Sequence, residues 1–112
     1  EFLHVDDMAD ASLFVLNLPR HLYEADTQKM LSHTNVGCGT DISIRELARL
    51  VAKVVGFEGS ILTDPDKPDG TAKKLLDISR LAILGWQASI ALEEGLQQTY
   101  DWFLANQHQF RG

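Results

Sequence analysis

The clearest structural signal in this sequence is the stretch Ser43-Ile44-Arg45-Glu46-Leu47-Ala48-Arg49-Leu50-Val51-Ala52-Lys53-Val54-Val55-Gly56. Ser43 and Glu46 have the spacing of a capping box, in which serine accepts from the third helical N–H and glutamate reaches back. The apolar residues recur at intervals of three and four, and basic residues occupy the opposite face. Gly56 suits the left-handed conformation that ends many helices. The stretch therefore predicts an amphipathic helix that begins after Ser43 and ends at Gly56.

Three further helices are expected around this one. Each follows a side chain that can accept hydrogen bonds from a first turn, and they cover residues 7–18 after Asp6, 78–84 after Asp77 and 90–106 after Ser89. Pro19 ends the first, which is apolar on nearly every side and therefore needs burial. Residues 20–32 have no clear period and are expected to be irregular, with at most a helical turn.

Short apolar runs between the helices indicate β-strands at residues 2–5, 34–36 and 60–63, and residues 74–76 are expected to be extended. Helices that alternate with short strands are typical of an α/β or α+β fold. Strands this few and this short do not form a stable sheet by themselves. We therefore expect an α/β domain that depends on neighbouring structure.

The composition limits the class of protein. A chain of 112 residues is one domain at most, or a piece of one. The net charge of −6 argues against nucleic acid or an anionic membrane as partner, although a local phosphate site is compatible with it. Cys38 is the single cysteine, so no intrachain disulfide can form, which fits a cytoplasmic protein. The chain opens without Met, inside an apparent strand, and we expect a fragment.

The most polar part of the chain is residues 64–77, where acids, lysines, prolines and a glycine alternate before Leu75-Leu76. Proline fixes φ and glycine permits positive φ, so this loop is stiffened by two different means. A stiff loop with charges of both signs is a candidate site for a polar, anionic ligand. The alternative is a solvated turn that binds nothing.

Other candidate motifs fail on spacing. Gly37-Cys38-Gly39 resembles half of a dinucleotide fingerprint, but position 42 carries Ile42 instead of glycine, so a tight strand-to-helix turn is the better interpretation. A calcium loop that starts at Asp64 would need Glu at position 75, which is Leu75. Cys38 is expected to be a small packed thiol. The histidines show no metal-ligand spacing, and Trp86 and Trp102 lie on core-like faces. No catalytic, cofactor-binding or metal residue is therefore expected.

A set of motifs, in order along the whole chain, resembles one family. They are Glu1-Phe2-Leu3-His4-Val5-Asp6-Asp7-Met8-Ala9, Asn35-Val36-Gly37-x-Gly39, Ile44-Arg45-Glu46-Leu47-Ala48, Lys67-Pro68-Asp69-Gly70-Thr71-x-x-Lys74-Leu75-Leu76-Asp77, and Trp102-Phe103-Leu104-x-Asn106-Gln107-x-x-Phe110-Arg111-Gly112. Together they resemble the C-terminal third of the GDP-L-fucose synthases, which are extended short-chain dehydrogenases/reductases. The fourth motif is the most specific; the first and third occur loosely in related enzymes.

The resemblance implies that residues 1–112 are the C-terminal substrate-binding domain of a longer parent whose NAD(P)-binding Rossmann-like domain is absent here. Such a parent epimerises C3 and C5 of GDP-4-keto-6-deoxy-D-mannose and reduces its C4 ketone with NADPH. The family's cofactor fingerprint, its Ser and Tyr-x-x-x-Lys set, its epimerisation Cys and His, and a substrate-contacting Arg all precede Glu1. The fragment alone is therefore expected to be inactive and not to bind NADP, and Cys38 is not the family's catalytic cysteine.

The resemblance also implies two substrate contacts in the polar loop. Asp69 falls at the position of a substrate-contacting aspartate, and Lys74 is expected to offset pyrophosphate charge. The implied partners are a GDP-sugar and the missing N-terminal domain, in a homodimeric cytoplasmic parent. The isolated fragment is expected to self-associate and bury four apolar residues: Phe2, Leu3, Phe14 and Val36. Two alternatives stay open: the C-terminal domain of another nucleotide-sugar epimerase or dehydratase, and a non-enzymatic α/β binding module.

Overall fold

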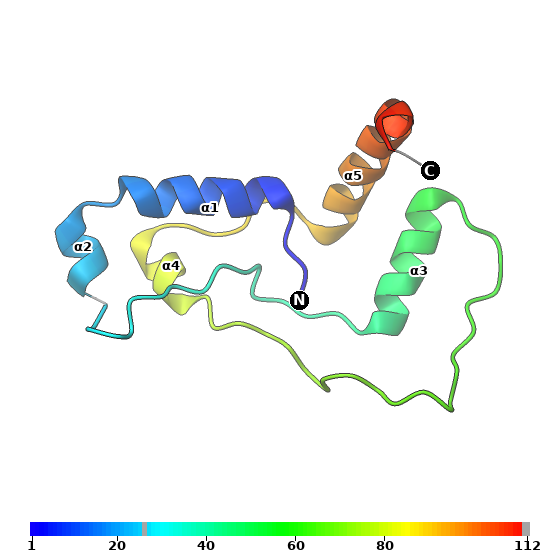
Figure 1. The fold of residues 1–112 in the computed structure, drawn as a ribbon, viewed down its shortest axis with the longest axis horizontal. Helices are drawn as coiled ribbons and strands as arrows, with labels where there is room; N and C mark the ends of the chain where they lie inside the picture. Colours follow the sequence, from blue (N-terminus) through cyan, green and yellow to red (C-terminus); the bar gives the residue numbers. More distant parts are fainter. Residues whose placement is uncertain (26, 111–112) are drawn as a thin grey trace. The chain divides into compact units, whose positions relative to one another are not determined.

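The structure, a computed structural model, describes residues 1–25 and 27–110. Its helices are α1 (Val5–Asn17), α2 (Arg20–Ala25), α3 (Ile44–Val55), α4 (Ser79–Leu84) and α5 (Leu92–Asn106), followed by the 3₁₀ helix η1 (Gln107–Gln109), as Figure 1 shows. The chain divides into two compact units. The first is Glu1–Asp41 with Lys74–Ile90, and the second is Ile42–Lys73 with Ala91–Gly112.

The expected short strands are absent from the described residues, so the strand part of the α/β prediction is not confirmed. Val5 begins α1, residues 34–36 and 60–63 form no ladder, and the only β pairing in the described ranges is an isolated antiparallel bridge between Gln28 and Leu31. A strand exists only where a neighbouring backbone takes its hydrogen bonds. The described part of the chain consists of helices joined by irregular segments.

Helix α3 confirms the prediction made from the capping box. The side chain of Ser43 accepts from the N–H of Glu46 at 3.2 Å, and the Glu46 carboxylate accepts from the N–H of Ser43 at 3.1 Å. Gly56 adopts φ +70° and ends the helix as expected. Within the second unit α3 packs against α5, and the Lys53 ammonium donates to the Glu93 carboxylate.

The other helix starts differ from the predictions. His4, and not Asp6, caps α1, because its Nδ1 accepts from the N–H of Asp6 at 3.3 Å. Helix α4 begins at Ser79, one residue late, although Asp77 still accepts from the Ser79 N–H at 2.9 Å. Helix α5 begins after Ala91, so the prediction that Ser89 caps it is wrong.

The irregular region after α1 is more ordered than expected. Helix α2 is six residues long, and the Arg20 guanidinium donates to Glu24 one turn later at 2.7 Å. The Tyr23 hydroxyl donates to the carbonyl oxygen of Ser32. These two contacts hold a segment that has no hydrophobic period.

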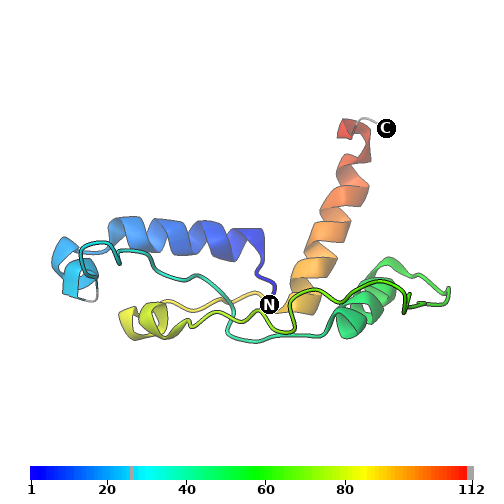
Figure 2. The same ribbon diagram turned by 60° about the horizontal axis from the view of Figure 1, so that its bottom comes forward.

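The core of the first unit lies between α1 and the short helix α4, which is drawn beneath α1 in Figures 1 and 2. Ala11, Leu81 and Trp86 are buried, and five partly buried residues pack on them: Phe14, Val15, Val36, Leu84 and Ala88. The prediction for Trp86 is confirmed, whereas Trp102 is 56% exposed and is not a core residue. Leu13 and Leu16 of α1 are also exposed, at 59% and 80%. No helix in the described ranges is long and apolar enough to cross a membrane.

Candidate functional site

The polar loop, residues 64–77, is exposed along its whole length. It opens with a turn at Asp64, whose carboxylate accepts from the N–H of Asp66 at 3.1 Å and whose carbonyl oxygen accepts from Lys67 at 3.3 Å. The boundary between the two units falls inside the loop, between Lys73 and Lys74. The loop is therefore anchored differently at its two ends.

Asp69 and Lys74, the two residues expected to contact substrate, belong to different units: Asp69 to the second and Lys74 to the first. Both are exposed, and neither side chain makes a hydrogen bond or ion pair with the described residues. An exposed carboxylate can accept from ligand hydroxyl or N–H groups, and an exposed ammonium can donate to phosphate. Their roles toward a ligand stay predictions.

The carboxylate of Glu1 anchors the C-terminal end of the loop, a role that the sequence did not predict. It accepts from the N–H of Gly39 at 2.8 Å and from the N–H of Leu76 at 2.8 Å. Partial burial raises the pKa of the Glu1 carboxyl, but the hydrogen bonds from Leu76, Gly39 and Cys38 outweigh it, so this pKa lies below its usual value. Glu1 is therefore ionised at neutral pH and holds three segments together.

A polar recess of about 210 Å³ lies beside this anchor, lined by His33, Asn35, Asp77, Ser79 and Arg80. The Asn35 amide donates to the carbonyl oxygen of Asp77 at 3.2 Å, and the Arg80 guanidinium donates to that of His33 at 2.8 Å. The backbone and side chain of Ser79 lower the pKa of Asp77. These bonds tie residues 33–35 to the start of α4. In the sequence, only Asp77, placed before the expected helix 78–84, indicated this region.

A second carboxylate of the first unit, Asp7, is buried and joins the first turn of α1 to residues 89–90. It accepts from the backbone N–H and hydroxyl of Ser89, at 3.1 and 3.0 Å, and from the N–H of Ile90 at 3.0 Å. Burial raises the pKa of Asp7, but these hydrogen bonds, first those of Ile90 and Ser89, outweigh it and leave the pKa below normal. Both oxygens of the Asp7 carboxylate therefore accept hydrogen bonds from within the first unit.

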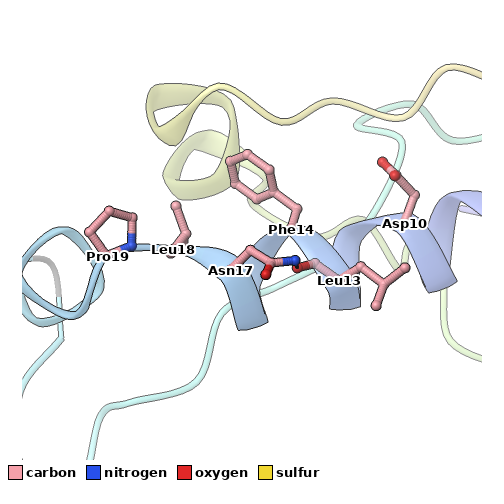
Figure 3. A pocket seen from close by; sticks show the side chains of 6 residues that line it. All are labelled: Asp10, Leu13, Phe14, Asn17, Leu18 and Pro19. Carbon is pink, nitrogen blue, oxygen red and sulfur yellow. Dashed lines mark hydrogen bonds between the residues drawn. The ribbon is translucent and has the colours of Figure 1, made fainter.

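An apolar groove of about 460 Å³ runs along α1 (Figure 3). Its lining residues come from one helix and the turn after it: Asp10, Leu13, Phe14, Asn17, Leu18 and Pro19. The Asp10 carboxylate, at one end of the groove, already accepts a hydrogen bond from the indole N–H of Trp86 at 2.8 Å. Most of the side chains that line the groove are apolar: Leu13, Phe14, Leu18 and Pro19.

The glycine-flanked thiol behaves as a packed group. Cys38 is half-buried, and its Sγ lies 3.4 Å from the carbonyl oxygen of Thr40. Gly39 adopts φ +74°, which fits the expected tight turn, although no strand precedes it. In the ranges 1–25 and 27–110, no group of three or more His, Cys, Asp or Glu side chains could hold a metal ion.

The solved structures that are similar to this chain include GDP-sugar enzymes. A GDP-6-OMe-4-keto-L-xylo-heptose reductase from C. jejuni matches with a TM-score of 0.84 and 34% identity, over 95% of this chain and 31% of that one. MlghC, a GDP-mannoheptose C4 reductase from Campylobacter jejuni with NADP bound, matches with a TM-score of 0.76 and 33% identity, over 93% of this chain and 31% of that one. The fold is therefore that of a portion of GDP-sugar reductases.

Sequence relatives narrow this class. GDP-L-fucose synthase of Escherichia coli K12 is 58% identical over 112 residues, which is 100% of this chain and 35% of the relative. GDP-L-fucose synthase 1 of Arabidopsis thaliana is 53% identical over 106 residues, which is 95% of this chain and 30% of the relative. No protein-family profile matches the chain. The chain is homologous to a C-terminal portion of the GDP-L-fucose synthases and spans about a third of their length.

Proposed function

We propose that the chain is the GDP-sugar-binding C-terminal part of an NADP-dependent epimerase/reductase. The longer enzyme would convert GDP-4-keto-6-deoxy-D-mannose to GDP-L-fucose by 3,5-epimerisation and 4-reduction. The observation that carries this proposal is the 58% identity with the Escherichia coli GDP-L-fucose synthase along the whole chain. Identity this high, without a gap in coverage, supports a shared substrate class as well as a shared fold.

The cofactor belongs, in this proposal, to an N-terminal Rossmann-like part that the chain lacks. The similar structure of MlghC has NADP bound, which supports a nicotinamide cofactor for the longer enzyme. The residues described here form no Gly-rich phosphate loop with the required spacing, since position 42 is Ile42. The chain alone is therefore proposed to be inactive. Separately, we propose that the longer enzyme is a cytoplasmic homodimer.

The substrate contacts are proposed to come from the polar loop. The Asp69 carboxylate would accept hydrogen bonds from the GDP-sugar, and the Lys74 ammonium would lie against its pyrophosphate. Their exposure and lack of partners in the described residues support this role, because neither has to break an existing contact to bind.

The test is turnover by the full-length protein with NADPH. GDP-4-keto-6-deoxy-D-mannose is the expected substrate, and the UDP- and dTDP-linked analogues serve as controls. Turnover of a UDP- or dTDP-sugar in preference to the GDP-sugar would overturn the proposal. Sequencing of the gene upstream of Glu1 is an independent check, because a Gly-rich strand–helix start and a Tyr-x-x-x-Lys motif are expected there. A start codon at Glu1 would favour the non-enzymatic binding module.

A second candidate is a GDP-sugar 4-reductase that does not epimerise. The similarity to the C. jejuni GDP-heptose reductases favours it. Epimerisation at C3 and C5 proceeds through removal of protons next to a ketone, so it exchanges these protons with solvent. Turnover in deuterated water separates the two candidates: the epimerase/reductase incorporates deuterium at C3 and C5, and a simple reductase does not.

A further inference from the structure

We propose that Glu1 is a positioning residue for substrate binding: its carboxylate holds the backbone that carries Lys74 against the turn at Gly39. This inference rests on the proposed function, in which the Lys74 ammonium lies against the pyrophosphate of the GDP-sugar. It explains how the backbone of Lys74 is held in position for that contact. Glu1 itself is not proposed to touch the ligand.

The geometry at Glu1 restrains the backbone on both sides of Leu75. The Glu1 carboxylate accepts from the N–H of Leu76 at 2.8 Å, and the main-chain nitrogen of Glu1 lies 3.3 Å from the carbonyl oxygen of Lys74. The carbonyl of Lys74 and the N–H of Leu76 are thus both in contact with Glu1. The backbone from Lys74 to Leu76 therefore has little conformational freedom. The second carboxylate oxygen accepts from the N–H of Gly39 at 2.8 Å, which fixes the anchor to a different segment.

The Gly37–Gly39 turn is shaped to admit this carboxylate. A Cβ added at Gly37 would lie 2.3 Å from Glu1 Oε1, so any side chain there would displace the anchor. Gly39 adopts φ +74°, and a Cβ there would lie 2.5 Å from Cδ1 of Ile78. Gly37 therefore leaves room for the Glu1 side chain, whereas Gly39 adopts a positive φ and leaves room for the side chain of Ile78.

The negative charge of Glu1 strengthens its hydrogen bonds to Gly39 and Leu76, and it is not neutralised by an ion pair with the Lys74 ammonium. Hydrogen bonds to an ionised carboxylate are stronger than those between neutral groups. The described structure contains no ion pair between the Glu1 carboxylate and the Lys74 ammonium. Glu1 restrains the Lys74 backbone, and the ammonium stays available for an anionic ligand.

The experiment measures steady-state kinetics of the full-length enzyme with three variants: Glu1→Ala, Lys74→Ala and the double variant. Each single substitution is expected to raise KM for the GDP-sugar about tenfold, with kcat and KM for NADPH unchanged. If Glu1 acts through Lys74, the double variant has the KM of Lys74→Ala, because both changes remove the same interaction. An unchanged KM in Glu1→Ala, or a double variant whose KM shows both losses multiplied, overturns the inference.

Asp7→Asn is the matched control for a general loss of stability. Asp7 also accepts from two backbone N–H groups of the first unit, but it is bonded to Ser89 and Ile90 and not to the polar loop. Its substitution should lower the unfolding midpoint and leave KM for the GDP-sugar unchanged. An equal rise in KM in this variant would show that Glu1 acts only through stability, and would overturn the positioning role.

Glu1→Gln covers the case in which Glu1→Ala does not fold. Glutamine keeps the shape and one acceptor oxygen but loses the other, so KM for the GDP-sugar should rise about threefold. An unchanged KM in this variant overturns the inference. Failure of the proposed function has a different signature: Lys74→Ala and Asp69→Ala would both leave KM for the GDP-sugar unchanged, whatever Glu1→Ala does.

Discussion

Asp7 and Ser89 form a two-point contact: one carboxylate oxygen accepts from both the backbone N–H and the hydroxyl of Ser89, at 3.1 and 3.0 Å. The other oxygen accepts from the N–H of Ile90 at 3.0 Å. Asp7 is 3% exposed, so none of these donors has water as a ready substitute. The contact ties the first turn of α1 to the segment after α4.

Asp7→Asn is therefore expected to destabilise the chain by about 1–3 kcal/mol, since one buried acceptor becomes an amide donor facing the Ile90 or Ser89 N–H. Urea unfolding followed by tryptophan fluorescence measures this, because Trp86 is buried in the same unit. Asp6→Asn is the control: Asp6 is exposed, and its substitution should shift the midpoint by less than about 0.5 kcal/mol. Equal midpoints for Asp7→Asn and the parent chain would contradict the prediction.

The same contact predicts a pH dependence. Because the folded-state pKa of Asp7 is lowered, its contribution to stability is present above the unfolded pKa, about 3.9, and is lost as pH falls through the lower folded value. The difference in unfolding free energy between the unsubstituted chain and the Asp7→Asn variant should be constant from about pH 7 to pH 5 and shrink below about pH 4. Urea midpoints measured across this range check it. A difference that grows on acidification would mean that the sign of the shift is wrong.

Asp69→Ala in the full-length enzyme should weaken GDP-sugar binding by about 1.5–3 kcal/mol, roughly one to two decades in affinity. NADPH binding should stay nearly unchanged. Asp66→Ala is a matched control, because it removes the same charge from the same exposed loop. Steady-state kinetics with both variants decide the matter: an unchanged KM and kcat in Asp69→Ala would retire the assignment.

The isolated chain is expected to self-associate at micromolar concentration. The structure places Phe14 and Val36 against the core, so the exposed apolar surface of α1 is carried instead by Leu13 and Leu16. Light scattering on the chain measures the association, and a Leu13→Glu/Leu16→Glu variant should reduce it, because charged groups resist burial in an interface. A cooperatively melting monomer at this concentration would show that the domain is stable alone.

Ser43→Ala should lower the stability of α3 by about 1 kcal/mol, because the Glu46 N–H loses its side-chain acceptor. Ser60→Ala, an exposed position outside the helices, is the control and should be neutral. Circular dichroism during urea unfolding compares the two. Equal midpoints would show that the capping box adds nothing to the folded chain.

The features that depend on near neighbours could be predicted from the order of the residues alone. The capping box of Ser43 and Glu46 joins residues three apart, and Gly56 and Gly85 adopt the positive φ that ends α3 and α4. Such contacts form wherever the helix forms, so spacing alone predicts them. The exposure of the polar loop also followed from its composition.

The hydrogen-bonding roles of Ser89, Asp7 and Glu1 could not be predicted in this way, because each depends on residues far away in the chain. Ser89 was expected to cap α5, but a partner 82 residues away takes both of its donors. The Glu1 carboxylate reaches Gly39 and Leu76, which are 38 and 75 residues away, and nothing in its local sequence indicates either partner. The expected strands, which are absent from the described residues, depend on distant residues in the same way. A capping hydrogen bond is completed within one helical turn. A strand or a buried carboxylate is stable only when distant parts of the chain supply its hydrogen-bond partners.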